Sequence, residues 1–245
     1  MKYLLIALTL SPLSVLAYSP SFTSMEVKIA YPCGTETKLN LEKEEKERIT
    51  FFDGNGNPLY KNSLILRKRV GLSGGDFTVK YRAAGSAIDF DKTLFEKLSK
   101  DSNGNLKCEI DMVFAEKDIS RPSRSCSFKT ESSELANSHI EFIKMTKNAP
   151  SLKDLKEFRV ESISHKIKLS GSQKDKNPFS KKPSVEKWET RGECKLEVSG
   201  KFDITGLGDN QILSLAQSVF NFIQELVPAK PSAAQGNKTS WALGL

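Results

Sequence analysis

Apolar and polar residues alternate with a period of two along several segments of the chain, and this pattern predicts a sheet. The clearest run extends from Phe51 to Arg82, where β-branched and aromatic residues fill three segments separated by Asn55-Gly56 and by a glycine-rich turn that begins at Ser73. Such pairs favour tight turns between antiparallel strands. We therefore interpret this part of the chain as a three-stranded meander.

The same alternation predicts strands before and after the meander. They are expected at Thr23–Tyr31, Leu106–Ala115, Arg124–Lys129, Leu155–Leu169, Val185–Thr190 and Gly192–Phe202. The second and third of these segments are expected to form a hairpin with its turn near Ser120-Arg121-Pro122, because proline and serine favour turns. About eight strands are predicted in total.

Other segments carry a helical period. Helices are predicted at Leu39–Arg48, Asp89–Lys100, Ser133–Lys147 and, most strongly, Asn210–Val227. Asp209 is a plausible N-cap for the last helix. The segment Leu39–Arg48 carries opposite charges at i,i+4 spacing, which favours a helix. The alternative is that it forms a polar strand of a hairpin. Gly171–Pro183 is polar and turn-rich and is expected to be a loop. Strands and helices together indicate an α+β fold built around a closed or nearly closed antiparallel sheet.

The amino terminus has the pattern of a secretory signal peptide over residues 1–17. Lys2 is followed by a mostly apolar run from Leu4 to Leu16, and Val15-x-Ala17 is a small-residue cleavage signal. An uncleaved anchor is the alternative. No later segment reaches 18 consecutive apolar residues, so no membrane span is expected after cleavage. We expect a periplasmic or secreted protein, with one domain over residues 18–227 and a disordered tail over residues 228–245.

Four cysteines lie in the exported part of the chain. An even number in an exported protein suggests two disulfides. Cys108 and Cys126 flank the predicted hairpin and could pair across its strands, which leaves Cys33 with Cys194 by elimination. The spacings fit no zinc motif, and free buried thiols remain the alternative.

The net charge of the whole chain is +7, and it falls to +6 when Lys2 is removed with the signal peptide. A basic protein attracts anions of many kinds, from phosphate compounds to acidic polymers. Aromatic residues make up only 9% of the chain, and it contains no nucleic-acid-binding motif. We therefore expect an anionic ligand that is not a nucleic acid.

Charged residues gather on one face of several predicted strands. The pairs at i and i+2 are Glu26/Lys28, Arg67/Arg69, Lys80/Arg82, Glu109/Asp111 and Lys195/Glu197. Side chains two apart in a strand point to the same face. Either this face meets bulk water in an ordinary sheet, or it closes around a lumen while helices cover the apolar face. Periodicity leaves both possibilities open.

The order of these motifs resembles the CYTH family, the triphosphate tunnel metalloenzymes that include thiamine triphosphatases and inorganic triphosphatases. The resemblance spans about Ser24 to Val227. Its motifs are Ser24-Met25-Glu26-Val27-Lys28, Phe51-Phe52-Asp53, Leu66-Arg67-Lys68-Arg69, Thr78-Val79-Lys80, Glu109-Ile110-Asp111 and, more loosely, Phe158-Arg159-Val160 and Lys195-Leu196-Glu197.

The resemblance implies an eight-stranded antiparallel tunnel lined with charged side chains and covered by helices. It assigns phosphate binding to Lys28, Arg67, Arg69, Lys80, Arg82, Lys129 and Arg159. It assigns a divalent metal, Mg²⁺ or Mn²⁺, to Glu26, Glu109, Asp111 and Glu197. Arginine forks suit phosphate oxygens, and carboxylate oxygens suit hard cations. The implied activity is metal-dependent hydrolysis of a tri- or polyphosphate, with no catalytic residue assigned.

Ser24 departs from the family pattern because the opening motif E-x-E-x-K has a glutamate at this position. The loss of one carboxylate weakens metal affinity, so binding could survive where turnover does not. A non-catalytic periplasmic binding module for a phosphorylated anion is therefore the alternative function. A structural barrel whose charged face only meets water is a third interpretation.

Overall fold

The computed structural model describes residues 22–72, 74–84, 106–114, 122–131, 137–144, 149–232 and 238–245. Three sequence predictions lie outside these residues: the signal peptide at 1–17, the helix Asp89–Lys100, and Ser120-Arg121 of the hairpin turn.

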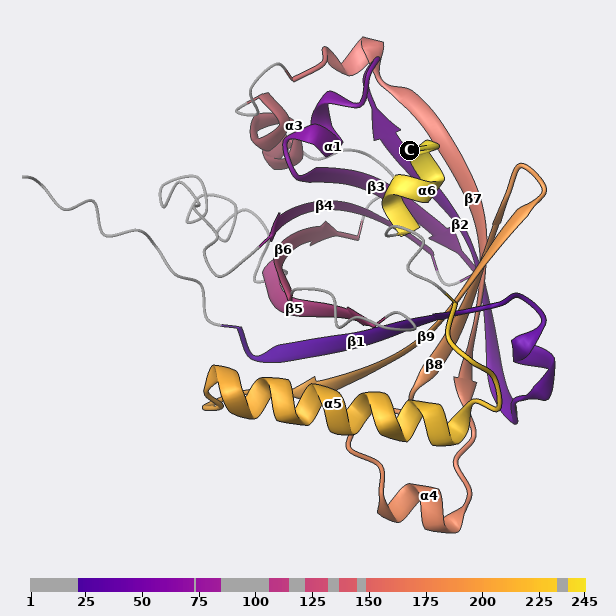
Figure 1. Cartoon of the computed structure of the whole chain (residues 1–245). Coiled ribbons are helices and arrows are strands. Elements are labelled where there is room, and N and C mark those ends of the chain that lie inside the picture. The colour runs from indigo at the N-terminus through magenta and orange to yellow at the C-terminus, as the bar shows by residue number, and fades with distance from the viewer. Residues whose placement is uncertain are drawn as a thin grey trace, which may run out of the picture.

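Within the described residues, nine strands form a closed barrel (Figure 1). The strands are β1 (Ser24–Tyr31), β2 (Leu41–Asp53), β3 (Leu64–Gly71), β4 (Gly74–Ala84), β5 (Leu106–Phe114), β6 (Ser123–Thr130), β7 (Lys156–Ile167), β8 (Ser184–Thr190) and β9 (Glu193–Asp203). Their order around the barrel is β1-β5-β6-β4-β3-β2-β7-β8-β9. The α+β class and the closed sheet are therefore confirmed.

The predicted eight-stranded antiparallel barrel is wrong in two respects. The barrel has nine strands, and β1 runs parallel to its neighbour β5 while the other neighbouring strands are antiparallel. A parallel pair needs a long connection, and the chain between β1 and β5 supplies one through β2, β3 and β4.

From Leu41 onward, the charged segment Leu39–Arg48 is a strand, which was the alternative interpretation, rather than a helix. It forms the first half of β2, which pairs with β7 from Leu41 opposite Ile167 to Asp53 opposite Lys156. An i,i+4 ion pair on a helix contributes only about 0.2–0.5 kcal/mol. A ladder of backbone hydrogen bonds to β7 and β3 outweighs so small a local preference.

The helical elements lie between and after the strands. They are η1 (Thr35–Lys38), α1 (Pro58–Lys61), α3 (Asn137–Lys144), η2 (Leu152–Asp154), α4 (Gly171–Asp175), α5 (Asp209–Leu226) and α6 (Lys238–Leu243). The strongest predicted helix is confirmed as α5, although Asp209 is its first residue and Gly208 is the N-cap. The predicted loop Gly171–Pro183 contains the short helix α4.

Helix α5 covers the apolar outer face of β1 and β9 (Figure 1). Met25, Val27 and Ile29 of β1 are fully buried and belong to one hydrophobic cluster with Ala216 and Val219 of α5. Burying a side chain of this size stabilises the fold by about 1.5–3 kcal/mol. Because these positions face the helix, the intervening charged positions of β1 face the interior of the barrel.

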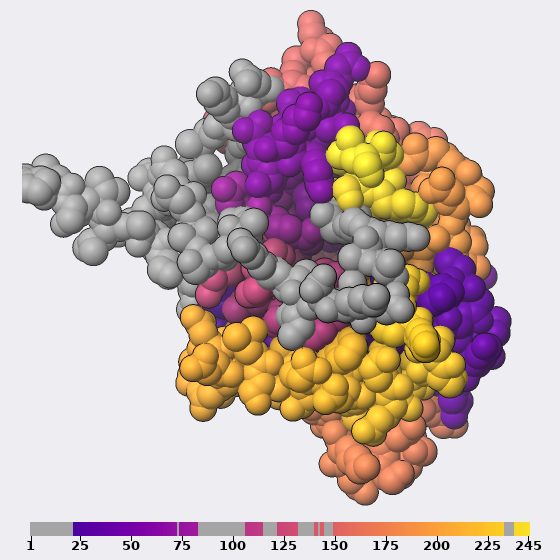
Figure 2. All heavy atoms as spheres, in the orientation of Figure 1, coloured from indigo at the N-terminus to yellow at the C-terminus, as the bar shows by residue number. Residues whose placement is uncertain are grey.

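Part of the interior is apolar, and α6 packs into it. Ile49, Val160 and Trp188 form a buried cluster with Ala242 and Leu243 of α6. Figure 2 shows the yellow atoms of this helix between the violet atoms of the early strands and the orange atoms of β8 and β9. The prediction of a disordered tail over 228–245 is therefore wrong for Lys238–Leu243, because these two apolar side chains gain burial against the barrel.

Two disulfides join the four cysteines in the pairs expected from the sequence, Cys33–Cys194 and Cys108–Cys126. The second pair lies directly across β5 and β6, where the two residues are partners in the register. Among the described helices, none is both long and apolar enough to cross a membrane.

Candidate functional site

The charged faces of the strands meet inside the barrel. Lys80 of β4 lies 3.3 Å from Glu109 of β5, although β6 separates these strands. Lys201 of β9 lies 3.2 Å from the same carboxylate, although β1 separates those strands. Side chains can contact each other across an intervening strand only on the concave face of a closed sheet. The prediction that the charged face closes inward is therefore confirmed.

Three carboxylates form the centre of this interior. Glu109 and Asp111 are two residues apart on β5, so they share a face, and Glu26 of β1 is the register partner of Asp111. Each of the three residues offers an oxygen within 4.8 Å of the others. The parallel pairing of β1 and β5 thus brings together three of the four predicted metal ligands.

Asp111 is the most heavily paired of the three. Its carboxylate accepts from Lys28 at 2.6 Å, from Lys80 at 2.9 Å, from Arg82 at 3.4 Å and from the Ser125 hydroxyl at 3.1 Å. Only 2% of the Asp111 side chain is exposed. Three of the predicted phosphate ligands therefore converge on one buried carboxylate.

Glu26 and Glu109 share further lysines. Lys28 Nζ lies 3.0 Å from Glu26, and Lys201 Nζ lies 3.6 Å from Glu26 and 3.2 Å from Glu109. Lys107 Nζ lies 2.7 Å from Glu109. Each carboxylate of the cluster consequently faces at least two ammonium groups.

These ion pairs shift the titration of the carboxylates. Burial alone would raise the pKa of Asp111, but Lys28, Lys80 and Arg82 together hold that pKa well below its ordinary value of 3.8. Burial likewise opposes ionisation of Glu109, and Lys80 and Lys201 lower its pKa. The cluster is therefore fully ionised near neutral pH.

The pKa values of the neighbouring lysines shift in opposite directions, according to the charges around each one. Burial acts to lower the pKa of Lys28, but Asp111 and Glu26 raise it well above its ordinary value of 10.5. Burial lowers the pKa of Lys80, and the neighbouring Lys28 and Arg82 add to that effect. Nearby carboxylates thus offset the burial of the Lys80 charge less fully than that of the Lys28 charge, although both lysines bond to Asp111.

Arg67 is a partly buried cation that forms no close ion pair among the described residues, although Asp76, Glu186 and Glu47 attract it from farther away. No described carboxylate lies within 4.0 Å of its guanidinium, and its Nε has no hydrogen-bond partner. Burial, reinforced by the nearby Arg69, lowers the pKa of Arg67 to about 9, so the group remains cationic at neutral pH. Arg69 lies 3.8 Å from Glu47, and its Nε also lacks a hydrogen-bond partner.

Two further predicted phosphate ligands lie away from this cluster. Arg159 alternates with the inward-facing Phe158 and Val160, so its side chain points outward, where it is 69% exposed and bonded to Glu157. Arg159 therefore lies outside the barrel, apart from the other predicted phosphate ligands. Lys129 lies on the inner face of β6 but is half-exposed and pairs with Asp76 at 3.3 Å.

Glu197, the fourth predicted metal ligand, is paired within a second acidic site. It lies on the inner face of β9, opposite Glu186 of β8 in the register. Lys238 of α6 lies 2.8 Å from Glu197 and also bonds to Glu186. In this structure an ammonium group therefore occupies the oxygens that the resemblance assigns to a metal.

Sequence reasoning missed three residues of this interior. Lys201 follows Lys195 and Glu197 at even spacing on the same strand, and Glu186 alternates with apolar Val185 in the same manner. The two-residue alternation of polar and apolar positions could have identified both Lys201 and Glu186. Lys238 carried no such signal, because its place depends on how the end of the chain packs.

The cluster of Glu26, Glu109 and Asp111 fits a divalent metal. Three carboxylate oxygens close together are the donor set that Mg²⁺ and Mn²⁺ prefer. The same oxygens bond to lysine and arginine side chains here, so these cations must move aside, toward an anionic ligand, as a metal enters.

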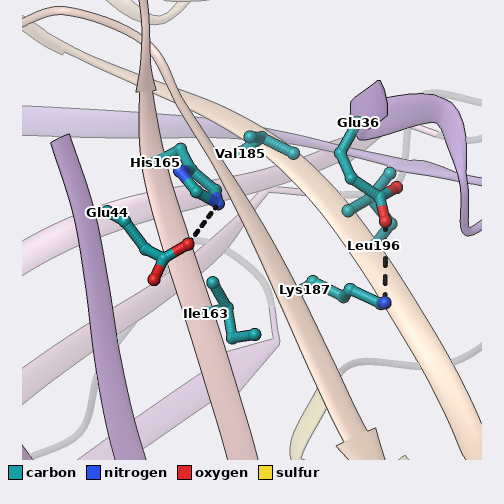
Figure 3. Close-up of a pocket in the computed structure, with 7 residues that line it drawn as sticks. All are labelled: Glu36, Glu44, Ile163, His165, Val185, Lys187 and Leu196. Atoms are coloured by element: carbon teal, nitrogen blue, oxygen red, sulfur yellow. Dashed lines mark ion pairs between the residues drawn. The ribbon is translucent and has the colours of Figure 1, made fainter. Parts of the chain in front are cut away.

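A small pocket lies on the outside of the barrel (Figure 3). Its polar lining consists of two ion pairs, His165 with Glu44 at 3.8 Å and Lys187 with Glu36 at 3.6 Å. Val185 and Leu196, which also line it, belong to the outer apolar face. Since each charged group already has a partner, this pocket offers no free ligand for a phosphate.

No protein-family model matches the chain, and no curated protein matches it. Among solved structures, the fold is similar to a candidate adenylyl cyclase from Hippeastrum with a dominant triphosphatase activity. That likeness has 10% sequence identity and a TM-score of 0.49, and it covers 90% of this chain and 95% of the other.

A candidate adenylate cyclase from Bacillus halodurans is 15% identical, with a TM-score of 0.47 over 90% of this chain and 97% of that one. A third, from Vibrio parahaemolyticus, is 10% identical, with a TM-score of 0.40 over 92% and 100% of the two chains. The triphosphatase activity is that of the Hippeastrum protein.

Proposed function

We propose that this protein binds a tri- or polyphosphate anion inside its barrel together with Mg²⁺ or Mn²⁺, and that it hydrolyses a terminal phosphate. The observation that carries the proposal is Arg67, a partly buried arginine with a buried, unpartnered Nε and no described carboxylate within 4.0 Å of its guanidinium. A cation that loses water without gaining a close ion pair is costly, and an arginine fork is matched by phosphate oxygens. A bound anion would supply the missing countercharge.

The remaining cations extend the same binding surface. Arg67 and Arg69 lie two apart on β3, and Lys80 and Arg82 lie two apart on β4, the neighbouring strand. Together they form an electropositive area on the inner face of the barrel. Lys28 adjoins this area through Asp111, and Lys129 lies at its edge.

The carboxylates would hold the metal and the lysines would hold the anion. Glu26, Glu109 and Asp111 are the metal ligands in this proposal, because they form the acidic cluster of the described residues. A bound divalent ion would polarise a phosphoryl oxygen and favour deprotonation of water. Lys28 and Lys80, which now bond to Asp111, would turn to phosphate oxygens and keep the anion in place.

Export is part of the proposal. The two disulfides form readily outside the reducing cytoplasm, and the amino-terminal pattern is that of a signal peptide. Nucleoside triphosphates are scarce in such compartments, so inorganic polyphosphate or another phosphorylated compound is the more available ligand.

Phosphate release from tripolyphosphate tests this proposal. We expect Mg²⁺- or Mn²⁺-dependent release by the wild type and its loss in Arg67→Met and Glu109→Gln. Arg159→Met is the matched control, because that arginine lies on the outside. Release that is insensitive to both interior variants, or absent in the wild type, would count against hydrolysis at this site.

A non-catalytic binding module is the second candidate, and one observation favours it. Each carboxylate of the cluster is already neutralised by lysine or arginine, and Ser24 replaces a glutamate of the family pattern. A metal must therefore compete with the protein's own cations. Calorimetry separates the two functions, since tight binding of tripolyphosphate without product supports the module.

A further inference from the structure

The interior of the barrel has an apolar side that adjoins the arginines of the proposed anion site. Phe51 of β2 is the register partner of Arg67 on β3, and Ile49 is the partner of Arg69. Residues directly opposite each other in an antiparallel pair share a face, with Cβ atoms about 4.5–5.5 Å apart. An anion held by these two arginines would therefore border the apolar side of the interior.

Ile65 extends this apolar side along β3. It lies two residues before Arg67, so both side chains point to the same face, and it is the register partner of Lys80. Ile49, Phe51 and Ile65 are buried members of the interior hydrophobic cluster. We call these three side chains the inner apolar patch. The patch thus adjoins three cations of the proposed anion site.

Helix α6 covers the inner apolar patch. Ala242 and Leu243 are buried in the same hydrophobic cluster as the patch. The helix contacts β2, which carries two of the three patch residues, and it also contacts β7. Figure 1 shows the yellow helix against β2. The end of the chain therefore fills the space beside the arginines.

Polar contacts hold both ends of α6 in this place. The guanidinium of Arg191, in the turn between β8 and β9, donates to the carbonyls of Trp241 and Ala242 at 3.3 and 3.1 Å. The indole Nε1 of Trp241 donates to Glu193 at 3.0 Å. At the start of the helix, Lys238 bonds to carboxylates of β8 and β9. These contacts keep the apolar side chains of the helix on the patch.

We propose that α6 restricts the anion site to phosphate chains without a bulky organic group, and that Leu243 is the residue that determines this specificity. An aromatic group attached to a bound phosphate would gain burial and stacking on Phe51. The side chains of α6 already cover that surface. An inorganic chain makes its contacts with the cations and leaves α6 in place. This inference rests on the proposed function and narrows the class of its ligand.

A ligand with a large organic group would have to displace α6 to reach the inner apolar patch. Displacement exposes Ala242 and Leu243 to water and breaks the hydrogen bonds that Arg191 donates to the helix. The apparent affinity for such a ligand is lowered by the cost of that opening. A ligand with a small organic group, or with none, avoids the cost.

Two triphosphate monoesters of equal charge test the proposal. Methyl triphosphate and ATP have the same phosphate groups and differ in the size of the organic group. Calorimetry in the presence of EDTA, which removes the metal and with it the proposed hydrolysis, measures both affinities. We expect the wild type to bind ATP at least about tenfold more weakly than methyl triphosphate, since ATP must first expose Leu243 to water.

Leu243→Gln should remove this discrimination. The amide is similar in size to the leucine side chain and uncharged, but its burial without a hydrogen-bond partner is costly, so α6 should leave the patch. We expect the variant to bind ATP at least about tenfold more tightly than the wild type does, with unchanged affinity for methyl triphosphate. Leu245→Gln is the matched control and should behave as the wild type, because Leu245 lies in the same segment and is 60% exposed.

Arg191→Met loosens α6 while Leu243 stays intact. It removes two hydrogen bonds to the helix, so the affinity for ATP should rise in this variant too. Hydrogen exchange of the backbone amides over residues 238–245 shows whether the helix has moved, and we expect faster exchange in both variants. Unchanged exchange in both would overturn the inference, because these contacts would not hold α6. Faster exchange with an unchanged ratio of the two affinities would also overturn it, since α6 would not border the ligand.

The wild type separates this inference from the proposed function. If it binds neither monoester nor tripolyphosphate, the proposed function fails, and the restriction by α6 fails with it. If it binds tripolyphosphate and methyl triphosphate but binds ATP equally tightly, the proposed function stands and the restriction by α6 is refuted.

Discussion

Lys28 Nζ lies 2.6 Å from Asp111 Oδ1, and this contact joins the first strand of the barrel to the fifth. It depends on the parallel pairing of β1 with β5, in which Glu26 rather than Lys28 is the direct partner of Asp111. Lys28 reaches the carboxylate diagonally and completes a group of three cations around it. The interior is thus organised around one aspartate.

Asp111→Asn should destabilise the ligand-free protein strongly. Removing this charge leaves Lys28 and Lys80 buried without their main partner, and breaking a buried ion pair in this way costs about 3–5 kcal/mol. Urea unfolding followed by circular dichroism measures the loss. Asp175→Asn, at an exposed position in α4, is the control and should change stability little. A loss of similar size in both variants would refute the central role of Asp111.

Stability should fall in acid. Asp111 and Glu109 have pKa values below their ordinary values of 3.8 and 4.5, so their contribution is complete above those values and is lost as the pH falls through the folded-state pKa. Lys28 has a raised pKa, so its contribution is present below 10.5 and is lost only at higher pH. We expect urea midpoints that are flat between about pH 5 and pH 8 and that decline below about pH 4.

The decline should be smaller in Asp111→Asn, because that variant has already lost a carboxylate whose pKa lies well below its ordinary value. Urea midpoints for both proteins at pH 7, 4 and 3 make the comparison. Parallel declines in the two proteins would show that other carboxylates govern acid unfolding.

Arg67→Met should weaken anion binding without destabilising the fold. The substitution removes a partly buried cation that has no described carboxylate within 4.0 Å, so stability should stay level or rise. The affinity for tripolyphosphate should fall at least about tenfold, since a charged hydrogen bond contributes about 1.5–3 kcal/mol. Isothermal calorimetry measures the affinity. Arg159→Met should bind as the wild type does, and equal losses in the two variants would contradict an interior site.

Tripolyphosphate should raise the melting temperature of the wild type. A ligand at 100 times its Kd stabilises the folded state by about 2.7 kcal/mol, provided that it does not bind the unfolded chain. Thermal unfolding with and without tripolyphosphate measures the shift, and sodium sulfate at equal ionic strength controls for general salt effects. The absence of any specific shift would favour a barrel that binds no such anion.

The two disulfides should differ in their effect on stability. Their loops span 161 residues for Cys33–Cys194 and 18 residues for Cys108–Cys126. In the chain-entropy model, replacing both cysteines of a pair by serine costs about 5 kcal/mol for the longer loop and about 3 kcal/mol for the shorter one. Urea unfolding measures the loss of stability in each double variant. A larger loss for the shorter loop than for the longer one would contradict the chain-entropy model for this protein.

Local patterns predicted most of the strands. Alternation located β1, β5, β8 and β9 to within a few residues, because a strand with one apolar face repeats every two residues whatever its neighbours are. The helical period likewise located α5. The same approach failed for Leu39–Arg48, where charge spacing suggested a helix and long-range pairing with β7 produced a strand.

The sequence by itself determined which residues share a face, and it identified the resemblance that placed Glu26, Glu109 and Asp111 in one site. Only the tertiary structure decided which face is enclosed. Arg159 has the right residue type, but it alternates to the outside of β7. Lys238 reaches Glu186 from 52 residues away in the chain. Periodicity reports local alternation, whereas these placements depend on barrel closure and on packing between segments far apart in sequence.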